Sequence, residues 1–398
     1  MTGRSAPRGT YVFDGPAGRL GRPLNRMLQS LCTEGARTDF RADEAAYCLR
    51  FALSAEQTTA VLERDWQAML DLGGSIFYVY KLAMMDGRSM QYLGGVFTGM
   101  TEAEFTAAMA AGDGPMSEVI WGLGTSHVPS IGAAMDRDLT ADPRWAPLFD
   151  GYAPARAWLA QRTPDVAILV YNDHANGVDL DIVPTFAIGT AERYRVADEG
   201  YGRRAVPDVT GDPDLSFHLL EHLIDDGFDL TVFAELDVDH GFTVPLSVWT
   251  PDPGDAWPCP VVPIMVNVIR YPQPTAARCY ALGQAIGRAL ASYDGARTVG
   301  ILGTGGMSHQ LAGTRAGFVN PGFDHMFLEA IADDPQRLTA LHRDEYIRLA
   351  GSEGIELIMW LVMRGAMNER VRTVHTAYHV PASNTAAGLA LLDNRSTP

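Results

Sequence analysis

The sequence predicts a layered α/β/α domain with a mixed sheet, preceded by a small all-helical domain. Residues 20–112 carry apolar side chains at helical spacing. From residue 117 onward, short runs rich in Val and Ile alternate with helical stretches, a pattern typical of α/β layers. The punctuated joint GDGPM, residues 112–116, separates the two regions. We therefore expect two domains, residues 1–112 and residues 117–398.

The expected helices of the first domain begin at recognisable capping residues. Asp39, Asp43 and Ser54 are candidate N-caps within the stretches 39–54 and 54–73. The stretch 101–112 opens with a Thr-x-x-Glu capping box and ends at a glycine. These signals predict several short helices.

Five short apolar runs are the expected strands of the second domain. They span residues 117–124, 165–172, 229–236, 261–268 and 297–305. Helical stretches at 212–227 and 279–293 lie between some of them. Strands that alternate with helices favour a largely parallel or mixed sheet.

Composition and charge exclude several classes of partner. A formal net charge of −17 argues against binding to nucleic acid or to anionic membranes. No apolar run approaches the roughly 18 residues of a membrane span, and the N-terminus shows no secretory signal, so we expect a cytoplasmic protein. The four cysteines show no CxxC spacing, which indicates reduced thiols rather than a zinc knuckle.

Four histidines follow expected strands. His127, His174, His240 and His309 each lie just beyond an apolar run. The C-terminal edge of an open α/β sheet is where ligands bind, so distant strands could bring these rings into one crevice. One such histidine alone would be interpreted as a hydrogen-bonded loop residue. Four of them favour a metal site or an acid/base site.

Glu356 precedes the apolar run Leu357–Met363, which predicts a buried helix. An ionised carboxylate buried there needs a compensating cation or strong donors. Two imidazoles and one carboxylate form the ligand set of non-haem Fe(II) oxygenases. The alternatives are a salt bridge to an arginine, or a carboxylate that caps the turn at Gly354.

Other motifs favour ordinary structural roles. The HLLEH stretch, His218 to His222, matches a zinc-protease pattern, but its helix is expected to be an amphipathic surface helix. GTGGMS begins like a dinucleotide-binding loop but has Ser308 where the final glycine belongs. Ser126 and Ser308 each precede a histidine without a G-x-S-x-G motif, which argues against a serine hydrolase.

Several motifs together resemble a known family. TSHVPSIGAA, PDVAILVYNDHA, DVDHGFTVPLS, GTGGMSHQLAGTRAG, AGSEGIELIMWLVMRGA and HVPASNTAAG are similar to the catalytic β subunit of LigB-type extradiol dioxygenases, the protocatechuate 4,5-dioxygenase family. The match runs in order over roughly residues 117–390. The helical N-terminal part resembles the small α subunit of the same enzymes. The two subunits, usually separate chains, are therefore expected to be fused here as LigAB.

The resemblance implies roles for the histidines and the buried carboxylate. His127, His174 and Glu356 match the iron ligands of the family. His309 in GGMSHQ matches its active-site acid/base. His240 in VDHG matches a histidine that contacts substrate or supports the site.

The resemblance also implies how substrate is held. Ser383 and Asn384 match the region that receives the ring carboxylate of the substrate. Met90 stands where the family carries an aromatic residue that closes over substrate, so either the substituent preference is shifted or the change is a conservative core swap. The helical domain is expected to cap the crevice and exclude water.

The implied reaction is Fe(II)-dependent cleavage of protocatechuate by O2, which yields 4-carboxy-2-hydroxymuconate semialdehyde. Gallate or 3-O-methylgallate is the alternative substrate. A zinc-type hydrolase and a metal-binding protein without catalysis are more remote alternatives. A homodimer is expected, because fusion of an αβ pair would turn a heterotetramer into two chains.

Overall fold

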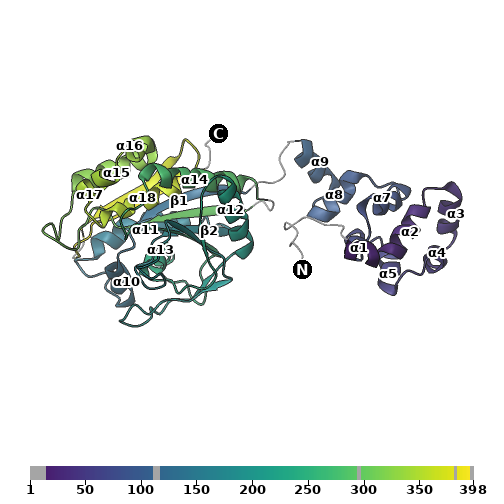
Figure 1. Ribbon diagram of the computed structural model, residues 1–398, viewed down its shortest axis with the longest axis horizontal. Helices are drawn as coiled ribbons and strands as arrows, with labels where there is room; N and C mark the ends of the chain where they lie inside the picture. The colour runs from purple at the N-terminus through teal and green to yellow at the C-terminus, as the bar shows by residue number, and fades with distance from the viewer. Residues whose placement is uncertain (1–14, 111–116, 294–296, 381–382, 395–398) are drawn as a thin grey trace. The chain divides into compact units, whose positions relative to one another are not determined.

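The computed structural model describes residues 15–110, 117–293, 297–380 and 383–394. The chain divides into two compact units, Met1–Pro115 and Met116–Pro398. The first unit is helical and the second is a layered α/β structure (Figure 1), so the predicted fold class is confirmed. The joint at residues 111–116 lies outside the described residues. Each unit is considered by itself below.

The helical unit is built from short helices, and two of the three expected N-caps are confirmed. These are α1 (Gly15–Leu20), α2 (Arg22–Ser30), α3 (Glu34–Ala42), α4 (Glu44–Arg50), α5 (Ala55–Glu63), α6 (Trp66–Asp71), α7 (Ile76–Met85), α8 (Met90–Thr98) and α9 (Glu102–Ala110). Asp43 caps α4, and Ser54 caps α5 in a reciprocal capping box with Gln57. The cap predicted at Asp39 is wrong, because Thr33 caps α3 and Asp39 lies inside that helix.

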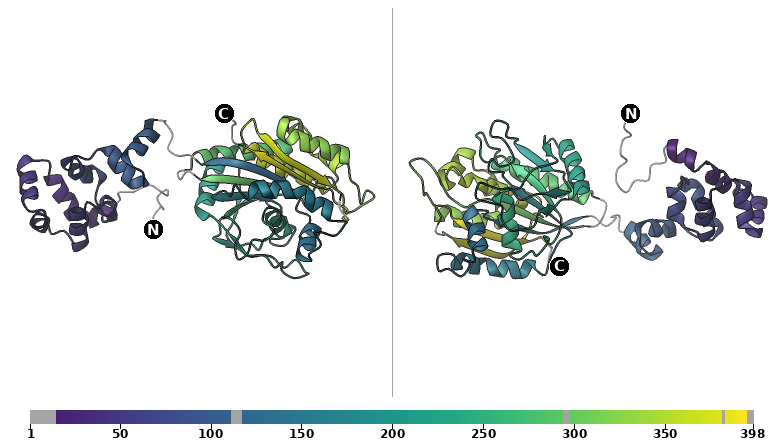
Figure 2. Two further views of the ribbon diagram at one scale, coloured as in Figure 1. Left: turned by 180° about the vertical axis from the view of Figure 1, so that it is seen from behind. Right: turned by 90° about the horizontal axis from the view of Figure 1, so that it is seen from below.

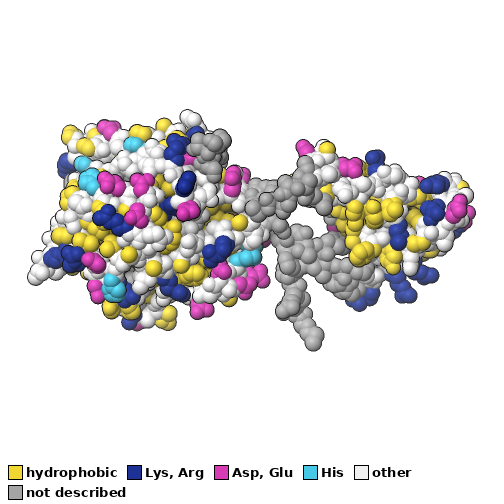
Figure 3. Space-filling view, turned by 90° about the horizontal axis from the view of Figure 1, so that it is seen from above, with side chains coloured by type: hydrophobic (Ala, Val, Ile, Leu, Met, Phe, Trp, Pro, Cys, Tyr) yellow, Lys and Arg dark blue, Asp and Glu magenta, His cyan; other side chains and the backbone are white. Residues whose placement is uncertain are grey.

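Apolar side chains remain exposed on the helical unit. Figure 3 shows hydrophobic side chains gathered on one face of it. The exposed ones include Leu49, Leu62, Phe77, Met84, Met90 and Val96. Apolar patches of this kind mark surfaces that a partner or ligand covers. The prediction that this unit caps the crevice stays a prediction.

The second unit contains an eight-stranded mixed sheet in the order β6-β3-β7-β2-β8-β1-β10-β9. Its strands are β1 (Glu118–Thr125), β2 (Val166–Tyr171), β3 (Phe186–Gly189), β6 (Thr231–Phe233), β7 (Val261–Val266), β8 (Thr298–Thr304), β9 (Arg372–His379) and β10 (Ala387–Asp393). The central strands β7, β2, β8 and β1 run parallel to one another. Strand β10 pairs antiparallel with both β1 and β9, and β3 pairs antiparallel with β7. A separate ribbon pairs β4 (Arg193–Tyr194) with β5 (Val209–Thr210).

Helices cover both faces of this sheet (Figure 2). Because strand side chains alternate between faces, Ile168 and Val170 pack into one core while Ala167 and Leu169 pack into the other. The first core is completed by α12 (Pro213–Asp225), α14 (Ala276–Ala291), α15 (Pro321–Asp333), α16 (Pro335–Thr339), α17 (Arg343–Ala350) and α18 (Ile358–Gly365). The second is completed by α10 (Pro129–Asp136), α11 (Ala146–Leu159) and α13 (His240–Trp249).

The expected strands differ from the observed ones at both edges of the sheet and at two inner strands, β3 and β10. The run 229–236 forms only the three-residue edge strand β6. Strands β3, β9 and β10 were not predicted, and β9 alternates too weakly between buried and exposed side chains to signal a strand. Within the described residues, no helix is long and apolar enough to cross a membrane.

Close packing of α14 against α18 gives the first testable prediction. A Cβ added at Gly283 would lie 2.0 Å from the carbonyl oxygen of Val362. Gly283→Ala should therefore lower the free energy of unfolding by about 1–3 kcal/mol, measured by chemical denaturation. Gly322→Ala in α15 is the matched control, because its Cβ meets only an ordinary contact at 3.6 Å. Equal stability of the two variants would contradict this packing.

Candidate metal and acid/base site

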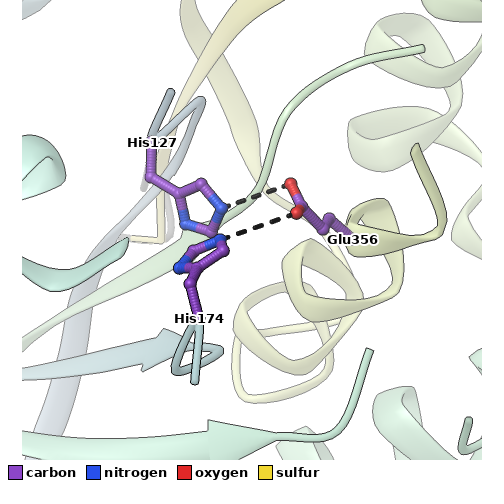
Figure 4. A group of neighbouring side chains, drawn as sticks. All are labelled: His127, His174 and Glu356. Carbon is purple, nitrogen blue, oxygen red and sulfur yellow. Dashed lines mark ion pairs between the residues drawn. The ribbon is translucent and has the colours of Figure 1, made fainter. Parts of the chain in front are cut away.

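Adjacent parallel strands deliver three of the predicted residues to one edge of the sheet. Strands β2, β8 and β1 are neighbours, so their C-terminal ends lie side by side. His127 follows β1, His174 follows β2 and His309 follows β8. Glu356 joins them from η1, a 3-10 turn (Gly354–Leu357) that leads into α18. Figure 4 shows the imidazoles of His127 and His174 both directed at the carboxylate of Glu356.

The His127 ring is buried in a defined tautomer. Its Nδ1 lies 2.9 Å from Thr304 Oγ1, and that hydroxyl donates its only proton to the carbonyl of Val170. Thr304 must therefore accept from His127, which places the proton on Nδ1 and leaves a lone pair on Nε2. Nε2 has no hydrogen-bond partner and lies 3.2 Å from Glu356 Oε2. Burial lowers the pKa of His127, which favours the neutral ring.

The His174 ring is oriented in the same way by a buried carboxylate. Its Nδ1 lies 2.9 Å from Asp239 Oδ2, which also accepts from the His174 backbone N–H at 2.7 Å. Its Nε2 lies 3.9 Å from Glu356 Oε1 and 3.1 Å from the amide nitrogen of Asn172. Burial disfavours a charged ring, but Asp239 outweighs that effect and raises the pKa of His174 to about 10. A bound metal would displace the proton that this ring otherwise carries.

Glu356 is 8% exposed and ionised. Burial opposes its charge, but the neighbouring His127 and His174 hold the pKa of Glu356 well below its ordinary value. Its Oε2 also accepts from the backbone N–H of Gly306 at 2.7 Å. Both alternatives raised from the sequence therefore differ from what is observed: the ionic partners are imidazoles rather than an arginine, and the donor turn is at Gly306 rather than Gly354.

His240 reaches the group by a different route from the one expected. It is the first residue of α13 rather than the end of a sheet strand, and its ring stacks on His174 with centroids 4.0 Å apart. Glu199 holds it twice: Oε2 lies 2.5 Å from Nδ1, and Oε1 accepts the backbone N–H at 2.9 Å. Nε2 of His240 is therefore left to act as an acceptor.

His309 is presented as a base. Its Nδ1 lies 2.8 Å from the carbonyl oxygen of Met307, which can only accept, so the neutral ring carries its free lone pair on Nε2. Its backbone N–H donates to Ala350, and its carbonyl accepts from Gly354 in η1. The backbone of His309 is thereby tied to the turn that carries Glu356.

One pocket of about 810 Å³ connects these side chains. Its lining includes His127, His174, His240, His309, Glu356, Ser383 and Asn384. No lysine or arginine is found among the described residues of this lining. A substrate carboxylate bound there would meet neutral donors together with whatever cation the histidines hold. The roles predicted for Ser383 and Asn384 stay predictions.

Met90 is the first residue of α8 in the helical unit and is 43% exposed. Its predicted contact with substrate stays a prediction. In the α/β unit, His218 Nε2 lies 2.7 Å from the carbonyl of Ala289, and His222 Nδ1 lies 2.9 Å from the carbonyl of His218. Both rings thus contact backbone acceptors, as expected of ordinary helix histidines.

The glycine-rich turn after β8 serves close packing. Gly305 has φ of +136°, and a Cβ there would lie 2.7 Å from the Cβ of Glu356. Only glycine lets the turn approach Glu356 this closely. The GTGG run is therefore explained without a dinucleotide.

The sequence did not indicate the residues that orient the imidazoles. Asp239 directly precedes His240 and could have been suspected as a helix cap for α13. Thr304 and Glu199 carried no local signal, because they reach His127 and His240 only through the fold.

The arrangement is suited to a metal ion. Ligand atoms of His127, His174 and Glu356 all lie within 4.8 Å of one another. Two ligands of one ion are separated by at most about 4.4 Å when each bond is about 2.2 Å, so small movements would complete the site. His174, Asp239 and His240 form a second group, which shares His174 with the first. In this second group, His174 Nδ1 and Asp239 Oδ2 already pair with each other.

The fold and the site define an α/β protein in which two imidazoles and one carboxylate converge beside a further histidine, His309. Residues 122–388 match the family described as the catalytic LigB subunit of aromatic ring-opening dioxygenase, and this chain belongs to that family. Residues 24–110 match the LigA subunit of aromatic-ring-opening dioxygenase LigAB. Both regions occur in one chain, so the predicted LigAB fusion is confirmed.

Curated relatives match part of the chain. Gallate dioxygenase from Pseudomonas putida is 45% identical over 200 residues, which are 50% of this chain and 58% of that protein. A 2,3-dihydroxyphenylpropionate/2,3-dihydroxicinnamic acid 1,2-dioxygenase from Mycobacterium is 35% identical over 46% of this chain and 55% of its own. A Rhodococcus protein of the same name is 29% identical over 271 residues, which cover 56% of this chain and 83% of that protein. The chain thus spans little more than half the length of the first two relatives.

Thr304 provides a test of the site geometry. Thr304→Val removes the acceptor that holds the Nδ1 proton of His127, so the ring loses its fixed tautomer. Affinity for Fe(II), measured anaerobically by competition with a chelator, should fall about 10- to 100-fold. Thr298→Val, at the opposite end of β8, is the matched control and should leave the affinity unchanged. Unchanged affinity in Thr304→Val would contradict the proposed orientation of His127.

Proposed function

We propose that this protein is an Fe(II)-dependent extradiol dioxygenase that opens the ring of a dihydroxybenzoate with O2. The convergence of His127 Nε2, His174 Nε2 and the Glu356 carboxylate beside His309 is the observation that carries this proposal. Membership of the ring-opening dioxygenase family supports it independently.

The donor set fits the proposed metal. The unpaired Nε2 of His127 faces a carboxylate oxygen at 3.2 Å, and two lone pairs so placed repel unless a cation lies between them. Two imidazoles and one carboxylate, without a thiolate, suit Fe(II) and leave other coordination positions open. Bound Fe(II) would supply the redox chemistry that protein side chains lack, allowing O2 to react with the ring.

The protein's own contribution centres on His309. With Nδ1 donating to Met307, its Nε2 can accept the phenolic proton that a catechol must release on binding, and can return it later in the reaction. His240, held by Glu199, lines the same pocket and can contact a substrate hydroxyl. Burial of both rings keeps bulk water from competing for these protons.

The substrate class follows from the pocket and from the relatives. A hydroxylated benzoate carries a carboxylate that Ser383 and Asn384, both short and polar, could orient without a counter-charge. Protocatechuate is the substrate expected from the sequence, whereas the likeness to gallate dioxygenase favours gallate. Both share the 3,4-dihydroxybenzoate unit, so the proposed chemistry is the same for either. The predicted homodimer and cytoplasmic location stay predictions.

The decisive experiment is anaerobic loading with Fe(II), followed by air and either protocatechuate or gallate. We expect equimolar uptake of O2 and substrate and a ring-opened product, which is a yellow semialdehyde in the case of protocatechuate. The ratio of the two turnover rates decides between the substrates. Substrate conversion without O2 would favour the zinc-type hydrolase instead. Iron binding without any turnover would favour a metal-binding protein without catalysis.

Variants separate metal binding from proton transfer. Glu356→Ala and His127→Ala should abolish iron retention, measured by metal analysis, because each removes a charged or lone-pair donor from the proposed centre. His309→Ala should retain iron and lose about 10²- to 10⁴-fold in kcat, as expected for a general acid/base. Normal iron content in the Glu356 variant would contradict the ligand assignment.

A further inference from the structure

A buried carboxylate lies behind the loop that carries His309, outside the pocket. Asp324, in the first turn of α15, is 0% exposed. No ion pair with a lysine or arginine is found for it among the described residues. Burial raises the pKa of Asp324, and three hydrogen-bond donors oppose that shift. Burying a carboxyl group costs free energy of folding unless hydrogen bonds compensate it, so the partners of Asp324 are informative.

Two of the three donors belong to Ser308, the residue immediately before His309. Asp324 Oδ1 accepts from the Ser308 backbone N–H at 2.8 Å, and Oδ2 accepts from the Ser308 hydroxyl at 2.6 Å. The same hydroxyl oxygen accepts from the backbone N–H of Asn320, the N-cap of α15, at 2.7 Å. Both the backbone and the side chain of Ser308 are therefore hydrogen-bonded to the start of α15.

The third donor ties this carboxylate to the sheet. Tyr378, on the edge strand β9, donates its hydroxyl to Asp324 Oδ2 at 2.9 Å. Asp324 thus connects three elements: the loop after β8, the N-terminus of α15 and strand β9. Serine N–H, serine O–H and tyrosine O–H all require an acceptor, which an ionised carboxylate provides and an amide only partly does.

The opposite side of the same loop contacts the proposed metal centre. The His309 backbone is bonded to Ala350 and Gly354, and Gly306 donates to Glu356. The loop is therefore held between η1 on one side and Asp324 on the other. A Cβ at Gly306 would lie 2.7 Å from Cε1 of His309, so the ring has little room on that side. A shift of Ser308 would move the His309 ring relative to Glu356.

We propose that Asp324 is a positioning residue, which acts through Ser308 to hold His309 where its Nε2 can exchange a proton with substrate. The expected effect on kcat rests on the proposed function, whereas the expected effect on the rigidity of the loop does not. Asp324 touches neither the pocket nor the ligands. Its effect is therefore on the geometry of proton transfer and not on binding of metal or substrate.

The test is Asp324→Asn in the full chain. Asparagine has one acceptor oxygen, which can serve either the Ser308 backbone N–H at the Oδ1 position or the two hydroxyls that share the Oδ2 position, but not both, so the loop should loosen. Hydrogen–deuterium exchange of peptides covering residues 300–312 should become faster, while Fe(II) content and KM stay within twofold of wild type. Since a misplacement of about 1 Å can cost about 100-fold, kcat should fall about 10- to 100-fold.

Control variants separate positioning from general destabilisation. Tyr346→Phe removes another buried tyrosine hydrogen bond of the same core, to the carbonyl of Leu338, without touching the loop. It should leave kcat and exchange in 300–312 unchanged. Ser308→Ala should reproduce the kcat loss, and it replaces Asp324→Asn as the test variant if Asp324→Asn does not fold. In a His309→Ala background, Asp324→Asn should cost no further activity, because the residue through which it acts is gone.

The outcomes distinguish this inference from the proposed function. Unchanged exchange in 300–312 in both Asp324→Asn and Ser308→Ala would overturn the inference, whether or not the protein turns over substrate. Faster exchange with full kcat would overturn its catalytic part. An equal loss of kcat in the wild-type and His309→Ala backgrounds would also overturn it. A wild-type protein that binds iron and cleaves no dihydroxybenzoate would instead refute the proposed function.

Discussion

The close approach of two imidazole Nε2 atoms to one buried carboxylate is the constraint on which the rest of the site depends. Placing the ionised Glu356 in the interior costs several kcal/mol unless a cation compensates it. Both rings have their far nitrogen occupied, by Thr304 in one case and Asp239 in the other, so each presents its Nε2 to Glu356. The fold therefore maintains a place for positive charge, which is the physical basis for proposing a metal there.

Strand β8 and the loop after it connect most of the parts. Thr304 ends the strand and orients His127, and Gly306 donates to Glu356. Ser308 donates two hydrogen bonds to Asp324, and His309 is the proposed base. The strand lies between β2 and β1, which carry the two ring ligands. Because one short segment touches both the metal ligands and the acid/base residue, the distance between them depends on how firmly that segment is held.

The family assignment and the site geometry support the same chemistry by independent routes. Family membership concerns residues 122–388 as a sequence, whereas the ring orientations are inferred from local hydrogen-bond partners. The absence of lysine and arginine from the described pocket lining bears on substrate choice. An anionic benzoate bound there would depend on the bound cation and on neutral donors, so binding of metal and substrate would be coupled.

The sequence alone determined the fold class and the side chains that meet. Apolar runs that alternate with helical stretches are local patterns, and they sufficed for the parallel strands β1, β2, β7 and β8. Buried Glu356 after a glycine-rich turn was recognisable because an acid among apolar residues needs a partner. The four-residue strand β3 and the edge strand β9 were not predicted, since short or half-exposed strands carry little pattern of their own.

Only the tertiary structure decided which groups orient the imidazoles. Thr304 lies 177 positions from His127, Glu199 lies 41 from His240, and Asp324 lies 16 from Ser308. No periodicity or capping rule links residues at such separations, because their contacts arise from the order of strands in the sheet and the path of the chain between them. His240 shows the same limit: it was expected after a strand, yet it enters the site as the first residue of a helix.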